Sequence, residues 1–239
     1  MGFFRSLIGN IFPHRCLRCG TLVGQTPGIC LSCWDGFVHV AGPLCSCCGI
    51  PLPEHTSEDA LCGACIHHPP LFQGAKSVFI YNEASKDLVL KLKNQDKTFL
   101  AKYVAPWMVR AGSTFWNAHP VLIPTPLHWR KQFKRQFNQS ALLAHHIGQQ
   151  VQLPVVHGLS RIKNSPSQGT FSTQQRAQNV KNAFHADARL LKGIKKCVLI
   201  DDVFTTGATV GACAKALKKA GVEEIYVLTL CRVVKEEPT

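Results

Sequence analysis

The fold is decided by residues 197–209, whose sequence is Cys-Val-Leu-Ile-Asp-Asp-Val-Phe-Thr-Thr-Gly-Ala-Thr. The apolar residues 197–200 predict a buried strand, and the Ala- and Lys-rich residues after the stretch predict a helix. Two adjacent carboxylates, Asp201 and Asp202, follow the predicted strand. The turn after them offers hydroxyls, backbone N–H groups and a helix N-terminus, all of which favour a phosphate, and Gly207 lets the backbone approach it closely. The stretch therefore predicts a site for a phosphorylated sugar whose ribose hydroxyls donate to the carboxylates.

The same alternation of apolar runs and amphipathic stretches extends from about residue 76 to the C-terminus. Continuous apolar strands separated by helices indicate a parallel sheet covered on both faces, with ligands at the carboxyl ends of its strands. The predicted strands are 78–81, 121–124, 197–200 and 225–230, and the predicted helices lie near 84–92, 97–112, 139–150, 172–182 and 208–220. The fold class is therefore α/β.

The N-terminal part is dominated by cysteine. Nine of the twelve cysteines fall in the first 65 residues, and eight of these form Cys-x-x-Cys pairs that suit tetrahedral zinc. A glycine follows the first pair of each half, so we predict two consecutive zinc ribbons, while cross-braced sites, one degenerate site or redox-active pairs remain alternatives. The predicted ligands are Cys16, Cys19, Cys30 and Cys33 at the first site, and Cys45, Cys48, Cys62 and Cys65 at the second. Cys47 is left without a role, and Cys197, Cys213 and Cys231 are predicted to be core residues.

Composition narrows the class of protein. The chain has 239 residues, a net charge of +13 and 46% hydrophobic residues, and no run of about 18 apolar residues that would predict a membrane span. This apolar content excludes a disordered chain. The N-terminus lacks the features of a signal peptide, which predicts reduced thiols and a cytoplasmic location. We predict two domains, a double zinc ribbon over residues 1–70 and an α/β domain over residues 71–239.

A basic and aromatic cluster follows the second predicted strand. Its cations suit the phosphates of single-stranded DNA and its rings suit base stacking, in keeping with the charge of +13. An equally weighted alternative is that Phe133 and Phe137, four residues apart, form the buried face of a helix. The DNA-binding candidates are Trp129, Arg130, Lys131, Phe133, Lys134 and Arg135.

Residues 201–209 resemble the phosphoribosyl-pyrophosphate signature of type I phosphoribosyltransferases, Asp-Asp-x-x-x-Thr-Gly-x-Thr preceded by an apolar strand. The resemblance implies that this ligand binds with Mg²⁺ at Asp201, Asp202, Thr205, Thr206, Gly207, Ala208 and Thr209. Cations and polar residues elsewhere would hold the pyrophosphate or belong to a lid. These candidates are Arg130, Lys131, Arg135, Arg161, Gln168 and Arg176.

The two halves together resemble the ComF family, in which a double zinc ribbon precedes a type I phosphoribosyltransferase domain. This resemblance extends to the sequence around residues 121–139, although Gln136 stands where the family usually has glycine. It implies two structural Zn²⁺ ions and a role in handling single-stranded DNA during natural transformation. Two alternatives stay open: an active phosphoribosyltransferase on an unidentified base or amine, and a zinc-ribbon adaptor that docks a DNA translocase or another competence protein.

Overall fold

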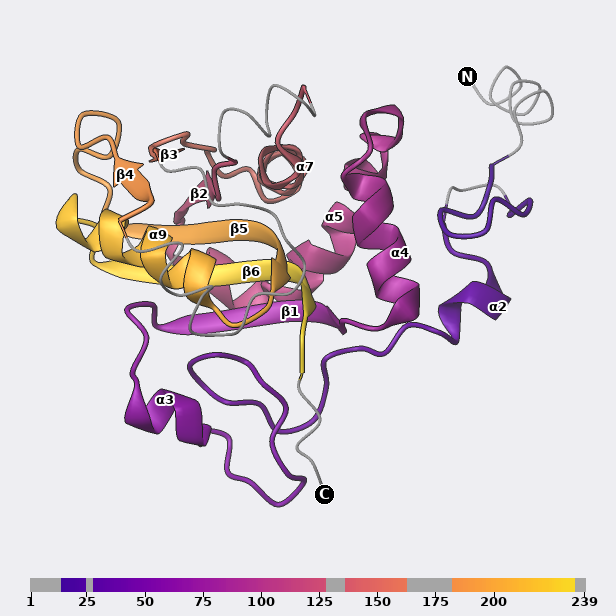
Figure 1. Ribbon diagram of the computed structural model, residues 1–239, viewed down its shortest axis with the longest axis horizontal. Coiled ribbons are helices and arrows are strands. Elements are labelled where there is room, and N and C mark those ends of the chain that lie inside the picture. The colour runs from indigo at the N-terminus through magenta and orange to yellow at the C-terminus, as the bar shows by residue number, and fades with distance from the viewer. Residues whose placement is uncertain (1–13, 25–27, 128–135, 163–181, 235–239) are drawn as a thin grey trace.

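The computed structural model describes residues 14–24, 28–127, 136–162 and 182–234, and its centre is a parallel sheet (Figure 1). The sheet has four strands in the order β1-β6-β5-β2, and each neighbouring pair is parallel. The strands are β1 (Gly74–Ile80), β2 (Val121–Pro124), β5 (Lys196–Phe204) and β6 (Glu224–Arg232). The predicted α/β fold with a parallel sheet is confirmed.

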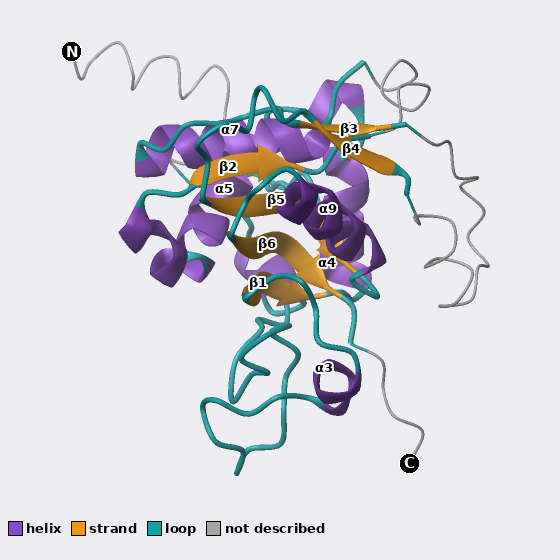
Figure 2. Ribbon diagram, turned by 90° about the vertical axis from the view of Figure 1, so that its left-hand side faces the viewer, coloured by secondary structure: helices purple, strands orange, loops and turns teal. Residues whose placement is uncertain are grey.

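Helices cover both faces of this sheet (Figure 2). Successive strand residues point to opposite sides, and because apolar residues predominate along the strands, both faces of the sheet are apolar and need to be covered. On one face, Val198 and Ile200 of β5 pack in the core with α4, α5 and α7. On the other face, Cys197 and Leu199 pack in the core with α9. The covering helices are α4 (Glu83–Leu92), α5 (Leu100–Ala111), α7 (Gln139–Val151) and α9 (Ala208–Lys219). Cys197, Cys213 and Cys231 are fully buried, as predicted, and burial raises the pKa of Cys197 and of Cys231 to about 12.

Strand β5 is longer than the sequence predicts. It continues through Phe204 because β6 runs alongside it to the end, with Asp201 opposite Thr229 and Phe204 opposite Arg232. The acidic pair therefore belongs to the strand instead of the turn after it. Since neighbouring strand residues face opposite sides, the two carboxylates have different surroundings.

The remaining elements are short. Strands β3 (Leu159–Arg161) and β4 (Phe184–Ala186) form an antiparallel pair apart from the main sheet. The predicted helix 97–112 begins only at Leu100, as α5. It is preceded by a separate 3₁₀ turn, η1 (Gln95–Lys97), which the Asn94 side chain caps by accepting a bond from the Asp96 N–H. The other short elements are α2 (Leu31–Trp34), α3 (Gly63–His67) and η2 (Ser113–Ala118). The predicted helix 172–182 lies almost wholly outside the described residues. Within the described ranges, each helix is too short or too polar to cross a bilayer.

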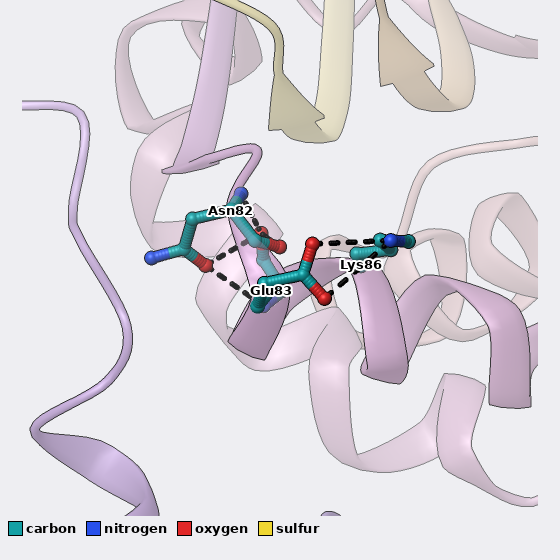
Figure 3. A network of polar contacts seen from close by, with 4 residues as sticks. Asn82, Glu83 and Lys86 are labelled. Atoms are coloured by element: carbon teal, nitrogen blue, oxygen red, sulfur yellow. Dashed lines mark hydrogen bonds and ion pairs between the residues drawn. The ribbon is translucent and has the colours of Figure 1, made fainter.

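Helix α4 begins at a capping box (Figure 3). The side chain of Asn82 accepts a hydrogen bond from the Ser85 N–H at 3.0 Å, and the Ser85 hydroxyl accepts one from the Asn82 N–H at 2.9 Å. Glu83 and Lys86 form an ion pair at 3.1 Å on the exposed side. The Asn82 amide also donates to the Gly36 carbonyl at 2.8 Å, which joins the start of α4 to the cysteine-rich segment.

The cysteine-rich segment packs against the α/β body (Figure 1). Residues 38–40 lie along the open edge of β1, where the Val40 N–H donates to the Val78 carbonyl at 2.9 Å. Leu17 and Phe37 join the core beside α4 and α5, whereas Cys45, Cys48 and Cys65 join the core beside α9. The two halves of this segment thus contact opposite sides of the core. The domain boundary near residue 70 stays a prediction.

Candidate functional site

The carboxylate of Asp201 lies in the carboxyl-terminal half of β5 and is held by hydroxyl and backbone donors. The residue is only 8% exposed. Its Oδ1 accepts a bond from the Ser140 hydroxyl at 3.0 Å and one from the Asp202 N–H at 2.9 Å. The Thr125 hydroxyl in turn donates to the Ser140 hydroxyl at 3.0 Å. The ends of β2 and β5 and the first turn of α7 therefore meet at this carboxylate.

Asp202 has a different set of partners. It is 7% exposed, and its Oδ2 lies 2.8 Å from the Nζ of Lys93, just after α4, and 3.4 Å from the Gln139 amide nitrogen. The Asp202 carboxylate is therefore paired with a cation, whereas the Ser140 hydroxyl and the Asp202 N–H, which donate to Asp201, are neutral. A ligand here therefore meets two different carboxylates: the negative charge of Asp202 is balanced by Lys93, whereas the partners of Asp201 given above are uncharged.

Burial, and then the neighbouring charge of Asp202, raise the pKa of Asp201 from 3.8 to about 7. Bonds from Thr125, Ser140 and the Asp202 N–H lower it in part. Arg161 of β3 also interacts electrostatically with this carboxylate. Burial lowers the pKa of Arg161, while the charges of Cys213 and Asp201 raise it. The guanidinium of Arg161 lies 5.4 Å from the centre of the Phe184 ring. A carboxyl that titrates near neutral pH at a strand end is typical of a functional site.

The loop after β5 combines a left-handed glycine with the N-terminus of a helix. Gly207 has a φ of 75°, a left-handed conformation that favours glycine, and a Cβ at this position would lie 2.9 Å from the Phe204 ring. Helix α9 begins at the next residue, and its first turn contains no acidic side chain. The Ala208 N–H makes a long bond to the Thr206 hydroxyl at 3.4 Å. The loop thus combines a close backbone approach with the positive end of a 12-residue helix.

The structure brings the predicted ribose and phosphate residues together and adds partners that the sequence reasoning did not assign. Asp201, Asp202 and the loop 205–209 lie at one end of the sheet. The unassigned partners are Lys93, Thr125, Gln139 and Ser140. A polar residue just after a strand and others in the first turn of a helix are the signal that could have identified Thr125, Gln139 and Ser140. The other predicted site residues lie outside the described ranges: Trp129, Arg130, Lys131, Phe133, Lys134, Arg135, Gln168 and Arg176.

Gln136, which replaces the glycine usual in the resembled family, is described. It has a φ of 61°, again the left-handed region that glycine favours. Two residues later, Asn138 caps α7 by accepting a bond from the Ser140 N–H at 2.9 Å, and its amide donates to the Thr125 carbonyl at 2.9 Å. The backbone shape for which glycine is suited is therefore present although the side chain is glutamine.

The paired cysteines gather in two groups of four, in sequential order. Within each group the sulfur atoms all lie within 4.8 Å of one another. The groups are Cys16, Cys19, Cys30 and Cys33, and Cys45, Cys48, Cys62 and Cys65. Gly20 and Gly49, which follow the first pair of each group, have φ values of 78° and 70°. Among the described residues, no histidine or carboxylate joins either group, so the donor set is four thiolates, which suits a structural zinc ion.

Backbone N–H groups support this donor set. In the first group Cys16 Sγ accepts bonds from the Arg18 and Cys30 N–H groups at 3.4 and 3.3 Å. In the second group Cys45 Sγ accepts bonds from the Cys48 and Cys62 N–H groups at 3.4 and 3.3 Å. Hydrogen bonds of this kind stabilise thiolates around a metal. The two groups share one local architecture, and both fit zinc.

The second group is joined to the phosphate loop through one buried arginine. Arg232 at the end of β6 is 4% exposed, and its guanidinium donates to the Cys48 carbonyl and lies 3.4 Å from the Cys48 sulfur. The same guanidinium lies 4.4 Å from the centre of the Phe204 ring, against which Gly207 is packed. Gly49 approaches the sheet so closely that a Cβ there would lie 2.2 Å from the Ala75 carbonyl oxygen. This half of the cysteine-rich segment is therefore part of the wall behind the site.

We expect metal analysis of the purified protein to find two zinc ions per chain. Each group provides four sulfur ligands at mutual distances compatible with one tetrahedral ion. Elemental analysis by mass spectrometry, normalised to protein, measures the stoichiometry. Changing Cys16 to Ser should remove one equivalent, whereas changing Cys47 to Ser should remove none, since Cys47 lies outside both groups. One ion or none in the unaltered protein would contradict the assignment.

Comparisons with known proteins agree with both halves of the structure. Residues 7–66 match the family described as double zinc ribbon domain, and residues 138–238 match the family described as phosphoribosyl transferase domain. The chain is 30% identical over 231 residues to competence protein F of Haemophilus influenzae, covering 93% of this chain and 99% of that protein. It is 32% identical over 221 residues to DNA utilization protein YhgH of Salmonella typhimurium, covering 87% and 91%. Competence protein ComFC of Bacillus subtilis is 27% identical over 200 residues, covering 81% and 79%.

A solved structure of an allosteric regulatory enzyme of purine biosynthesis also aligns with the chain. Its TM-score is 0.36 and its sequence identity is 18%, over 59% of this chain and 26% of that chain. The fold assignment rests on the strand order and on the matched families instead.

Proposed function

The chain belongs to the ComF family of competence and DNA utilization proteins, and from this premise we propose that it binds phosphoribosyl pyrophosphate with Mg²⁺ and handles single-stranded DNA during DNA uptake. The names of its relatives support a role in which DNA is taken up or used. The matched phosphoribosyl transferase family supports the small-molecule ligand. Thiolate zinc ligands need reduced cysteines, which supports the cytoplasm as the place of action.

One observation carries the small-molecule part of the proposal. A buried pair of carboxylates, Asp201 and Asp202, lies in the strand that leads into a left-handed Gly207 and the N-terminus of α9. The carboxylates are acceptors for the two vicinal hydroxyls of a ribose. The loop N–H groups and threonine hydroxyls are donors for its 5-phosphate. A ligand with both groups on one sugar matches this order of acceptors and donors.

The chain's own residues would bind and orient this ligand. Ser140 and Thr125 fix the position of the Asp201 carboxylate, and Lys93 fixes that of Asp202, so both oxygens are oriented before the ligand arrives. Mg²⁺, bound with the ligand, supplies positive charge to the pyrophosphate oxygens and to these carboxylates. The half-buried Arg161, which interacts electrostatically with Asp201, is a candidate for a contact with the anionic ligand in addition to the loop 205–209.

Calorimetric titration of the zinc-loaded protein with phosphoribosyl pyrophosphate tests this function. We expect saturable binding in the presence of Mg²⁺ and binding at least about tenfold weaker in its absence, since the metal compensates the pyrophosphate charge. Ribose 5-phosphate should bind more weakly than phosphoribosyl pyrophosphate because it lacks the metal-binding pyrophosphate. Absence of binding at millimolar ligand would overturn the small-molecule assignment. A parallel assay of pyrophosphate release with a panel of bases and amines separates a binding protein from an active transferase.

A further inference from the structure

A cavity of about 460 Å³ lies between the first cysteine group and the helices α4 and α5. The cysteine-rich segment contributes residues 14–20, α4 contributes Lys91, η1 contributes Lys97, and α5 with the residue before it contributes Phe99 and Tyr103. The volume lies in the range of small-ligand pockets and is enough for one nucleotide. Lys91 lines the cavity, whereas Lys93, two residues later, contacts Asp202.

The walls of the cavity are basic. Its lining includes four cations, Arg15, Arg18, Lys91 and Lys97, and no acidic side chain among the described residues. Lys91 is paired with Asp87 at 3.1 Å, but the other three form no ion pair within the part of the chain that the structure describes. A zinc ion with four thiolates carries about two negative charges. The three cations that have no ion pair in the described ranges, Arg15, Arg18 and Lys97, exceed this charge, so the lining keeps a net positive charge.

An exposed aromatic pair stands among these cations. Phe99 is 50% exposed although it is a large apolar residue. Its ring meets that of Tyr103 edge to face at 6.2 Å, and the Nζ of Lys97 lies 5.9 Å from the centre of the Phe99 ring. Phe99 directly precedes α5, whose next residues are buried in the core, so the ring is anchored on a rigid element. Rigid, half-exposed rings interleaved with cations are the combination on which single-stranded nucleic acids stack.

We propose that this cavity is a binding subsite for single-stranded DNA, with a base stacked on Phe99 and neighbouring phosphates held by Arg15, Arg18 and Lys97. The inference rests on the proposed DNA-handling function and specifies where it occurs. It places a DNA contact at the first cysteine group, whereas the predicted cluster 129–135 lies outside the described residues and stays a prediction.

The experiment measures fluorescence anisotropy of a labelled oligothymidylate of about 15 nucleotides, a length within the site sizes of single-strand binders, titrated with the full zinc-loaded chain. Changing Phe99 to Ala should weaken binding at least about fivefold, and changing Phe99 to Tyr should restore it, since stacking of one base contributes about 1 to 3 kcal/mol. Changing Arg15 and Lys97 together to Gln should lower the slope of log affinity against log salt by about 1.4, the value for two single-strand phosphates.

The matched control changes Lys192 and Lys215, two exposed lysines outside the cavity lining, to Gln. It removes the same charge and should leave the salt slope nearly unchanged. Arg15 and Lys97 are themselves exposed, and zinc content with a thermal melt verifies that each variant is folded. If the Arg15 and Lys97 variant behaves like the control, the subsite is wrong while DNA handling stands. If the unaltered protein does not bind the oligomer, or binds a duplex equally well, both the subsite and the single-strand function are overturned.

Discussion

Changing Asp201 and Asp202 together to Asn is expected to weaken binding of phosphoribosyl pyrophosphate by more than about 100-fold. Each carboxylate would accept a charge-assisted bond from a ribose hydroxyl, and such bonds contribute about 1.5 to 3 kcal/mol each. Two of them correspond to at least two factors of ten in affinity. Asparagine keeps the size and one acceptor oxygen at each position, so the loss reports charge and geometry instead of a cavity. Calorimetric titration with Mg²⁺ measures it.

The control for this change is a second adjacent acidic pair. Glu58 and Asp59 are both exposed and lie on the cysteine-rich segment, far in sequence from the ribose-phosphate loop. Changing Glu58 to Gln and Asp59 to Asn alters net charge by the same amount and should leave the affinity within about twofold. Equal affinities of the two double variants and the unaltered protein would sink the assignment of the acidic pair to the ribose.

Asp201 alone gives a second readout of the same assignment, because stability and binding should change in opposite directions. Its pKa in the folded protein is about 7 against 3.8 for the free side chain, so between these pH values the folded state holds more protons. Stability therefore falls as pH rises through this window, by about 1.4 kcal/mol per unit at most. Changing Asp201 to Asn should raise the free energy of unfolding at pH 8 by roughly 2 to 4 kcal/mol, with a small effect at pH 4. Denaturant titrations at the two pH values measure this difference.

The sequence predicted the sheet well because its strands are buried on both faces. Buried parallel strands are continuous apolar runs, and the runs at residues 121–124 and 197–200 are the parts of β2 and β5 that pair in register. The prediction ended β5 at Ile200, since two carboxylates are unfavourable in a buried strand. Pairing with β6 and the bonds from Ser140 and Lys93 override that preference. These partners come from distant parts of the chain, which local patterns do not reveal.

The cysteine pattern likewise predicted the two groups but not their place in the molecule. Spacing and glycines describe a local turn, and both turns formed as expected. The docking of Gly49 on Ala75 and of Arg232 on Cys48 depends on shape complementarity between residues far apart in sequence. Arg232 lies in a strand where an apolar residue would be the ordinary choice. A cation at such a position was the available signal for a buried anionic partner.

Arg232 should therefore matter both for metal retention and for the ribose-phosphate site. Changing Arg232 to Met keeps much of the side-chain volume but removes the cation that lies against the thiolate group. Loss of one partner of a buried charge pair costs about 3 to 5 kcal/mol, so we expect a lower free energy of unfolding and faster release of one zinc equivalent to a chelator. A metal-sensitive dye follows the release, and denaturant titration gives the stability. Arg189, an exposed arginine paired with Asp187 at 3.5 Å, is the matched control for a change to Met.

The two readouts distinguish a specific link from general damage. Arg232 touches the second cysteine group and not the first, so only one of the two zinc equivalents should become labile. Its guanidinium also covers the Phe204 ring that supports Gly207, so affinity for phosphoribosyl pyrophosphate should fall together with retention of that ion. Changing Arg232 to Lys keeps the charge but loses the planar contact with the ring, and should preserve the zinc better than it preserves the affinity. Release of both ions at the unaltered rate would contradict the link. If the link is found, the second ribbon is a structural wall of the proposed ribose-phosphate site. The first ribbon, with its basic cavity, would then be free to engage DNA.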